Sequence, residues 1–184
     1  QVELEAIDSF EGQEVAHESI TSSSQLLLNI PDPKKWHPDH PYLYDLTLRL
    51  KVDGVVVDEV GSYFGMRKYG KMRDEKGFWR FTLNDEPIFQ FGPLDQGYFP
   101  EGLYTAPSEE AMLFDIAYAK KIGCNMIRKH VKVEPARWYY ACDRLGMIVW
   151  QDMPNGGRTT KDAVVAFTFT SGIHRSDIRR LHRF

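Results

Sequence analysis

Polar side chains follow three short apolar stretches in the second half of the chain. The stretches cover residues 88–91, 126–127 and 149–150. The polar residues that follow them are Asp95, Gln96 and Tyr98, then Arg128, Lys129 and His130, then Gln151, Asp152 and Asn155. Together they offer carboxylates, amides, a guanidinium, an imidazole and a phenol, which bind polar ligands through hydrogen bonds. They can act on one ligand only if the intervening segments bring the three stretches side by side.

Those intervening segments have the periodicity of helices. Ser108 is a favourable N-cap, the stripe of Met112, Leu113, Ile116 and Ala117 follows it, and Gly123 is placed to end the helix. A second helix is predicted between Pro135 and Gly146, with Trp138, Tyr139, Cys142 and Leu145 as its stripe. Each helix leads into a short buried strand, at residues 124–128 and 147–150. This repeat predicts a parallel α/β arrangement, whose strands place ligands at their carboxyl ends.

Residues 1–67 follow a different pattern, which predicts β-structure. Apolar residues alternate over residues 26–30, 42–50 and 55–57, the period of half-buried strands. Asp53-Gly54 lies between the last two runs and predicts a hairpin with a primed turn. The proline-rich residues 31–41 predict an extended loop, and Asn84-Asp85 predicts a second hairpin over residues 78–89. Short strands separated by such turns and loops indicate a β-sandwich.

Composition excludes several classes of protein. The chain has 184 residues, a formal net charge of −3 and 42% hydrophobic residues, as expected of an ordinary globular chain. Near-balanced charge argues against nucleic acid as a partner, and the apolar runs are too short to cross a membrane. The basic tail with His174 and His182 resembles the first turns of a cut helix more than a nucleic-acid arm. Neither a GxGxxG nor a GxxxxGK[ST] motif occurs, which leaves a nucleotide-binding open sheet weakly supported.

No metal site or cofactor is predicted. The two cysteines, Cys124 and Cys142, lack the spacing of a zinc site and are expected to be buried thiols. His37 and His40 lie three residues apart in the proline-rich loop, but no further ligands accompany them. The compartment is left open between cytoplasm and a periplasmic or secreted location.

Several motifs resemble glycoside hydrolase family 2, the family of β-galactosidases, β-glucuronidases and β-mannosidases. Residues 36–44, Phe64-Gly65-Met66-Arg67-Lys68 and residues 81–87 resemble the end of its immunoglobulin-like domain and the entry to its catalytic barrel. Residues 123–128 and 142–152 resemble the second and third barrel strands. The resemblance implies an immunoglobulin-like β-sandwich, in part, over residues 1–67. The first three βα units of an incomplete (β/α)8 TIM barrel would follow over residues 68–184.

The resemblance also implies retaining hydrolysis of a terminal β-linked sugar by two glutamates. In the family, the acid/base follows an Asn-Glu pair after the fourth strand, and no such pair occurs here. The family's catalytic residues are therefore expected beyond Phe184. A barrel takes about 250 residues and an immunoglobulin-like sandwich about 100. The chain is accordingly expected to be an internal piece of a larger enzyme and inactive alone.

Transfer of individual binding residues is limited by one departure from the family pattern. Where β-galactosidases show Arg-x-Ser-His, this chain has Arg128-Lys129-His130. His130 is then equally well interpreted as a sugar ligand or as a structural histidine, and Arg128 either braces a catalytic carboxylate or bridges strands. Asp95, Gln96, Tyr98, Asp152 and Asn155 are substrate-binding candidates or turn and cap residues. Trp138 and Trp150 are expected in the core.

The predicted partner is a carbohydrate substrate, with neither nucleic acid nor membrane involved. A homo-oligomer is one further outcome, because unpaired edges of an unclosed barrel favour association. The alternative function is a non-catalytic module that binds carbohydrate or a partner subunit. It would need exposed aromatic residues, for which Trp36, Tyr42 and Tyr44 are the candidates in the first part of the chain.

Overall fold

The computed structural model describes residues 1–21, 25–154 and 168–169. The chain divides into two compact units. The first, here called the β unit, comprises Gln1–Trp36 and Tyr42–Met66. The second, called the α/β unit, comprises His37–Pro41 and Arg67–Phe184. Each unit is described by itself below.

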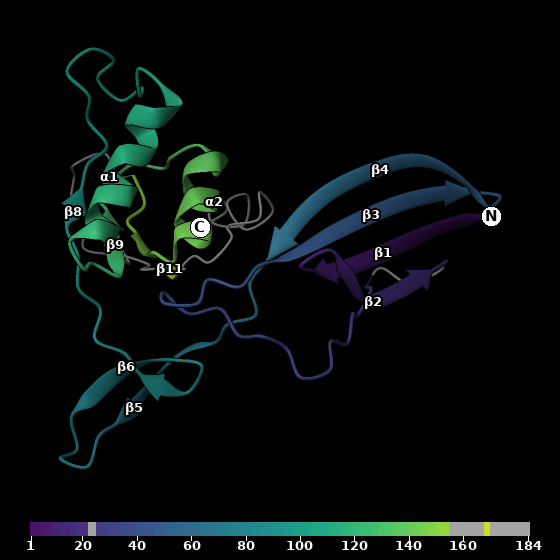
Figure 1. Ribbon diagram of the computed structural model, residues 1–184, viewed down its shortest axis with the longest axis horizontal. Helices are drawn as coiled ribbons and strands as arrows, with labels where there is room; N and C mark the ends of the chain where they lie inside the picture. The colour runs from purple at the N-terminus through teal and green to yellow at the C-terminus, as the bar shows by residue number, and fades with distance from the viewer. Residues whose placement is uncertain (22–24, 155–167, 170–184) are drawn as a thin grey trace, which may run out of the picture. The chain divides into compact units, whose positions relative to one another are not determined.

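The β unit is built on one antiparallel sheet in the order β2-β1-β3-β4 (Figure 1). Its strands are β1 (Val2–Phe10), β2 (Gln13–Ile20), β3 (Tyr44–Val52) and β4 (Val55–Phe64). Asp53 and Gly54 both have positive φ, at 50° and 82°, so the hairpin predicted at this pair is confirmed with its primed turn. The strand expected over residues 26–30 is wrong, because that segment has no regular structure.

The two faces of this sheet differ in chemistry. On one face Glu5 receives hydrogen bonds from Lys51 and His17 across neighbouring strands. On the other face Phe10 and Tyr44 pack with their ring centroids 4.9 Å apart. Asp8 is 0% exposed, and neither of its carboxylate oxygens has a hydrogen-bond partner among the described residues. Burial, and to a lesser extent the charge of Asp45, raises the pKa of Asp8 to about 6.

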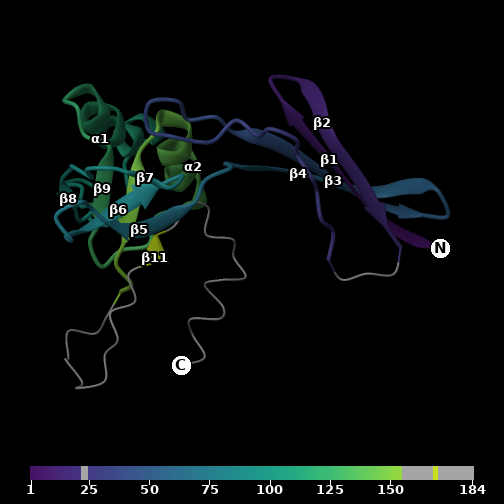
Figure 2. The same ribbon diagram turned by 90° about the horizontal axis from the view of Figure 1, so that it is seen from below.

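The α/β unit begins with a small antiparallel sheet, β5-β6-β7 (Figure 2). Its strands are β5 (Tyr69–Arg73), β6 (Trp79–Leu83) and β7 (Glu86–Pro87). The hairpin at Asn84-Asp85 is confirmed, with both residues at positive φ. The pairing of β5 with β6 was not predicted. Phe81 of β6 packs edge-on against Trp150, with ring centroids 5.4 Å apart, which joins this sheet to the rest of the unit.

The larger sheet has the order β11-β10-β9-β8. Its strands are β8 (Leu94–Asp95), β9 (Met126–Lys129), β10 (Ile148–Gln151) and β11 (Thr168–Phe169). The pairs β8/β9 and β9/β10 are parallel, as expected, whereas β11 runs antiparallel to β10. The described strands form no closed barrel. β8 begins later than the stretch 88–91, and β9 and β10 each extend one residue further than predicted.

Two helices pack beside the parallel strands, as their sequence signals predict. α1 (Glu109–Lys121) begins after Ser108, whose hydroxyl accepts a hydrogen bond from the Ala111 amide. α2 (Ala136–Leu145) ends at Gly146, which is in the left-handed region. Their buried side chains form one core with those of β9 and β10, centred on Ile116, Ile127, Trp138, Cys142 and Val149. Ala117, expected in the α1 stripe, is exposed, and Ala119 is buried instead.

Charged side chains fix the C-terminal part of α2. Arg67 donates to Asp143 over 2.5 Å, and both side chains are buried. At the C-terminal ends of the helices, the Lys120 ammonium donates to the carbonyls of Pro38 and Gly146. Burial lowers the pKa of Lys120. Neither helix of the described part of the chain has the length and apolar character that a membrane crossing requires.

Candidate functional site

The carboxyl ends of the three parallel strands lie level with one another. In the strand register Asp95 is opposite Lys129, and Lys129 is opposite Gln151. The three residues therefore form one row across the sheet. This row places the segments that follow β8, β9 and β10 next to each other, as the sequence predicted for parallel strands.

Strand periodicity divides the candidate residues between two faces of the sheet. Ile127 and Val149 belong to the core between sheet and helices. Because side chains alternate along a strand, Lys129 and Gln151 lie on that helix side, and the register places Asp95 with them. Arg128 and Trp150 lie on the opposite face. Gln96, His130 and Asp152 are each one position past the row and follow the same alternation.

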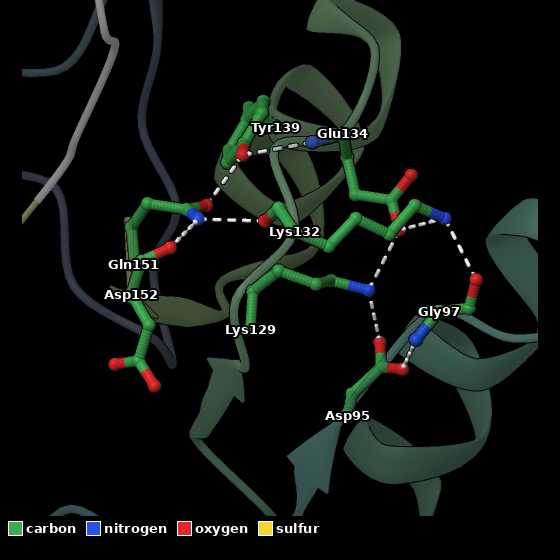
Figure 3. Close-up of polar contacts among 8 residues, drawn as sticks. All are labelled: Asp95, Gly97, Lys129, Lys132, Glu134, Tyr139, Gln151 and Asp152. Carbon is green, nitrogen blue, oxygen red and sulfur yellow. Dashed lines mark hydrogen bonds and ion pairs between the residues drawn. The ribbon is translucent and has the colours of Figure 1, made fainter. Parts of the chain in front are cut away.

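On the helix side, Lys129 lies between two carboxylates (Figure 3). Its ammonium, with the side chain 1% exposed, donates to Asp95 and, over 2.9 Å, to Glu134. Glu134 also pairs with Lys132, which donates to the carbonyl of Gly97 over 2.7 Å. The Gly97 amide in turn donates to Asp95 over 2.6 Å. Two cations and two carboxylates thus form a ring of contacts that joins the segment after β8 to the segment after β9.

Tyr139 and Gln151 extend this network to β10 (Figure 3). The Tyr139 hydroxyl accepts from the Glu134 amide over 3.1 Å and donates to the Gln151 side-chain carbonyl. The Gln151 amide donates to the backbone carbonyls of Lys132 and Asp152, over 2.7 and 2.6 Å. Burial raises the pKa of Tyr139, so its hydroxyl stays protonated as the donor. All three strand-following segments are therefore held by buried hydrogen bonds.

The opposite face carries a second set of polar groups, of which Gln96 is exposed and Arg128 is 39% exposed, whereas Asp152 is buried. Arg128 donates through Nε and Nη2 to the carboxylate of Asp152, with Nη2 to Oδ2 at 2.9 Å. The Asp152 carboxylate points away from the helix-side network (Figure 3). Beside them, the side chains of Gln96 and His130 share a hydrogen bond of 3.1 Å. A guanidinium, a carboxylate, an amide and an imidazole on one face can together bind vicinal hydroxyl groups.

An open groove of about 550 Å³ runs along the free side of β8, against α1. Leu94, Ile127, Ala119 and Ile122 give it an apolar lining, and residues 95–98 border one end. Asp115 also lines it, and burial, followed by the charge of Asp95, raises the pKa of that carboxyl. Among the described residues, no group of three histidine, cysteine, aspartate or glutamate side chains is arranged to hold a metal ion.

A comparison with known protein families shows which family the chain is related to. The family described as Glycosyl hydrolases family 2 matches residues 1–67. Relatives with glycosidase names extend the match well beyond that region. The chain belongs to glycosyl hydrolase family 2.

Relatives within family 2 include two curated β-galactosidases. That of Lactococcus lactis is 31% identical over 126 residues, which is 68% of this chain and 12% of the relative. That of Thermoanaerobacter pseudethanolicus is 25% identical over 127 residues, 69% of this chain and 17% of the relative. Among solved structures, β-glucuronidase 3 of Bacteroides uniformis is 28% identical with a TM-score of 0.68, over 83% of this chain and 19% of that one. The chain therefore spans less than a fifth of the length of these relatives.

Five of the predicted site residues of this family 2 chain are distributed over the face opposite the helices and the segment after β8. Gln96, Arg128, His130 and Asp152 lie on or beside that face, and Tyr98 lies two residues after Gln96. Asp95 instead contacts Lys129 on the helix side. Asn155, like the tail with His174 and His182, lies outside the described residues.

Sequence reasoning placed Lys129 and Gln151 at the strand ends but did not identify them, or Lys132, Glu134 and Tyr139, as the residues that hold the site together. One signal was present: alternation along β9 puts Lys129 on the same side as the buried Ile127. A lysine in that position requires a buried acid, and Glu134 follows five residues later.

Proposed function

We propose that this chain is part of a retaining, β-galactosidase-like family 2 enzyme that hydrolyses terminal β-linked sugars. The observation that carries the proposal is the face with Arg128, Asp152 and the Gln96–His130 pair at the carboxyl ends of three parallel strands. Parallel strands of α/β enzymes present their substrates to this end. Residues 1–67 would be the end of an immunoglobulin-like sandwich, and residues 68–184 the first three βα units of a TIM barrel.

In such an enzyme, hydrolysis depends on two carboxyl groups about 5 to 5.5 Å apart, an acid/base and a nucleophile. This chain has no Asn-Glu pair, the context of the family's acid/base. Its role in the proposal is to bind and orient the sugar. Arg128 is the principal contact, because its side chain is 39% exposed and its ion pair with the buried Asp152 holds the guanidinium in place. We therefore expect the 184-residue chain by itself to be inactive.

The test begins with the native gene product. Its intact mass is measured, and a panel of nitrophenyl β-glycosides is assayed with the purified protein. A product several times heavier than 21.3 kDa with activity on one sugar would support the proposal. In that product, Arg128→Met should lower kcat/KM by at least about tenfold, a loss of one charge-assisted hydrogen-bonding group. Arg80→Met is the matched control, because Arg80 is half exposed on the small sheet.

A second function is a non-catalytic module that binds carbohydrate or a partner subunit. Of the aromatic residues expected to serve it, Trp36 and Tyr44 are buried and Tyr42 is 37% exposed, so its remaining support is Tyr42 and the 57% exposed Trp79. A native product of this chain's own size that binds sugars without hydrolysing any nitrophenyl glycoside would favour this function. Turnover by the 184-residue polypeptide itself, free of host contamination, would contradict the expectation that it is inactive.

A further inference from the structure

The segment between β8 and α1 carries an ordered pair of exposed tyrosines. Tyr98 and Tyr104 lie edge to face, with ring centroids 5.5 Å apart and an interplanar angle of 76°. Their exposed fractions are 59% and 60%. In Figure 1 this teal segment extends past the start of α1. Two large aromatic side chains are thus left open to solvent next to the strand ends that bear Gln96 and His130.

Backbone hydrogen bonds close this segment into a tight loop. Phe99 and Leu103 exchange two backbone hydrogen bonds, of 2.7 and 2.8 Å, which make a tight loop between the tyrosines. The Thr105 amide donates to the Gly102 carbonyl over 2.9 Å. Leu103 has a positive φ of 54°, an uncommon conformation for this residue. Such a loop presents its side chains in a fixed arrangement, and binding to it costs little ordering entropy.

The helix-side network anchors the same loop at its base. Lys132 donates to the Gly97 carbonyl, and its ammonium lies 5.5 Å from the Tyr104 ring centroid and 5.9 Å from that of Phe99. A side chain at Gly97 would meet Glu134 at 2.3 Å and Lys132 at 2.7 Å, so the loop can approach this closely only with glycine there. The buried charges therefore support an exposed aromatic surface as well as the strand ends.

We propose that Tyr98 and Tyr104 form a stacking platform for a pyranose ring, so that the substrate is a β-linked oligosaccharide of at least two units. This inference rests on the proposed function and specifies its substrate class. The apolar C–H face of a pyranose packs on an aromatic face, whose negative potential attracts the slightly positive hydrogens. The edge-to-face arrangement adds a second ring at the side, and the two phenolic hydroxyls can hydrogen-bond to sugar hydroxyls.

The position of the platform defines which sugar it would bind. Tyr98 follows Gln96 by two residues, whereas Arg128 and Asp152 belong to the neighbouring strands β9 and β10. The terminal sugar would occupy the Arg128–Asp152 face, and the adjoining unit of the oligosaccharide would lie on the tyrosines. A monosaccharide glycoside would gain nothing from the platform.

Binding to the 184-residue chain is the test, with β-1,4-galactotriose, cellotriose and methyl β-D-galactopyranoside as probes in calorimetry and saturation-transfer NMR. One trisaccharide should bind more tightly than the methyl galactoside. Tyr98→Ala and Tyr104→Ala should each weaken its binding about fivefold to tenfold, the loss of one ring contact, and leave the methyl galactoside unaffected. Tyr104→Phe should retain most of the affinity because it keeps the ring.

The control variant is Phe114→Ala. Phe114 is 63% exposed and stacks with Tyr118 on α1, but unlike Tyr118 it does not line the groove that residues 95–98 border. The Phe114→Ala variant should bind the trisaccharides and the methyl galactoside as the unaltered chain does. Equal affinity for trisaccharide and methyl galactoside, with no effect of either tyrosine, would overturn the platform and leave the proposed function intact. If neither trisaccharide binds, the platform is likewise overturned, and hydrolysis by the native gene product decides the proposed function separately.

Discussion

In the β unit, Glu5 pairs with Lys51 and Arg49 and accepts a hydrogen bond from His17, and these three partners are 20%, 37% and 43% exposed. In the α/β unit, Lys129 is 1% exposed and is enclosed by Asp95, Glu134 and the Trp138 ring. The first cluster can lose a member because water and other cations replace it. The second cannot, because burial removes the solvent that would compensate. Ion pairs therefore fix loops in the α/β unit, whereas in the β unit the buried Glu5 has partners that remain in contact with water.

Removal of the enclosed cation should have the largest effect. In Lys129→Met, Lys132 is the one cation of the network in Figure 3 that remains for the Asp95 and Glu134 carboxylates. We expect the free energy of unfolding to fall by about 3–5 kcal/mol, as for a broken buried ion pair. Urea unfolding of the whole chain, followed by circular dichroism, measures this. Lys68→Met, which breaks a pair with both side chains more than 60% exposed, is the control and should change little. Because Lys68 and Lys129 belong to the same unit, equal losses would refute the contrast between buried and exposed ion pairs.

Asp8 is an exception among the charged groups of the β unit. Its carboxylate is buried, and neither oxygen has a hydrogen-bond partner among the described residues. Its pKa of about 6 lies above the ordinary value of an aspartate, so the folded state holds the proton more tightly than the unfolded state. Stability is then greatest below pH 4 for this group and is lost as the pH rises through 6. The loss approaches about 3 kcal/mol at pH 8.

Asp8→Asn should abolish most of this pH dependence and raise the stability of the β unit at pH 8. Hydrogen exchange of peptides from β1 and β3, measured between pH 4 and 8 with correction for intrinsic rates, reports on this unit alone. Asp58→Asn on the exposed strand β4 is the control and should leave the pH profile unaltered. An unchanged profile in Asp8→Asn would mean that the carboxyl is solvated in solution.

One left-handed glycine of the α/β unit, Gly146, is tightly enclosed, whereas Gly12 of the β unit is open. Gly12 in the β unit has φ of 77° and nothing within 4 Å of an added Cβ. Gly146 has φ of 73°, and its Cβ would lie 2.1 Å from the Pro38 carbonyl oxygen, which also accepts from Lys120. Gly12→Ala should cost about 1 kcal/mol from backbone strain alone. Gly146→Ala should cost about 2 kcal/mol more, from overlap with rigid backbone. Thermal or urea unfolding of the two variants compares them, and equal losses would show that the loop at Pro38 yields easily.

The elements of both units follow from local sequence, while the site depends on contacts that local sequence does not contain. Asp53-Gly54, Ser108 and Gly146 mark turns and helix ends through their own backbone preferences. The contact between Lys129 and Asp95 joins residues 34 positions apart and requires the register of β8 with β9. Periodicity indicates which face of a strand is buried, but the partner that makes a buried lysine tolerable appears only in three dimensions.

The smallest effect on stability is expected for the Arg49–Glu59 ion pair of the β unit, although its contact distance is short. Arg49 donates to Glu59 over 2.6 Å between β3 and β4, yet the two side chains are 37% and 53% exposed. Good geometry at an exposed site gains little, because both groups are well solvated when apart and salt screens them. Glu59→Gln should leave the urea midpoint unchanged within replicate scatter at 0.5 M NaCl, and close to unchanged at 0.05 M. Arg49 keeps its 3.6 Å contact with Glu5, which limits any loss further. A loss comparable to that of Lys129→Met would mean that burial is not what separates the two units, and that short contact distance alone determines the contribution of an ion pair here.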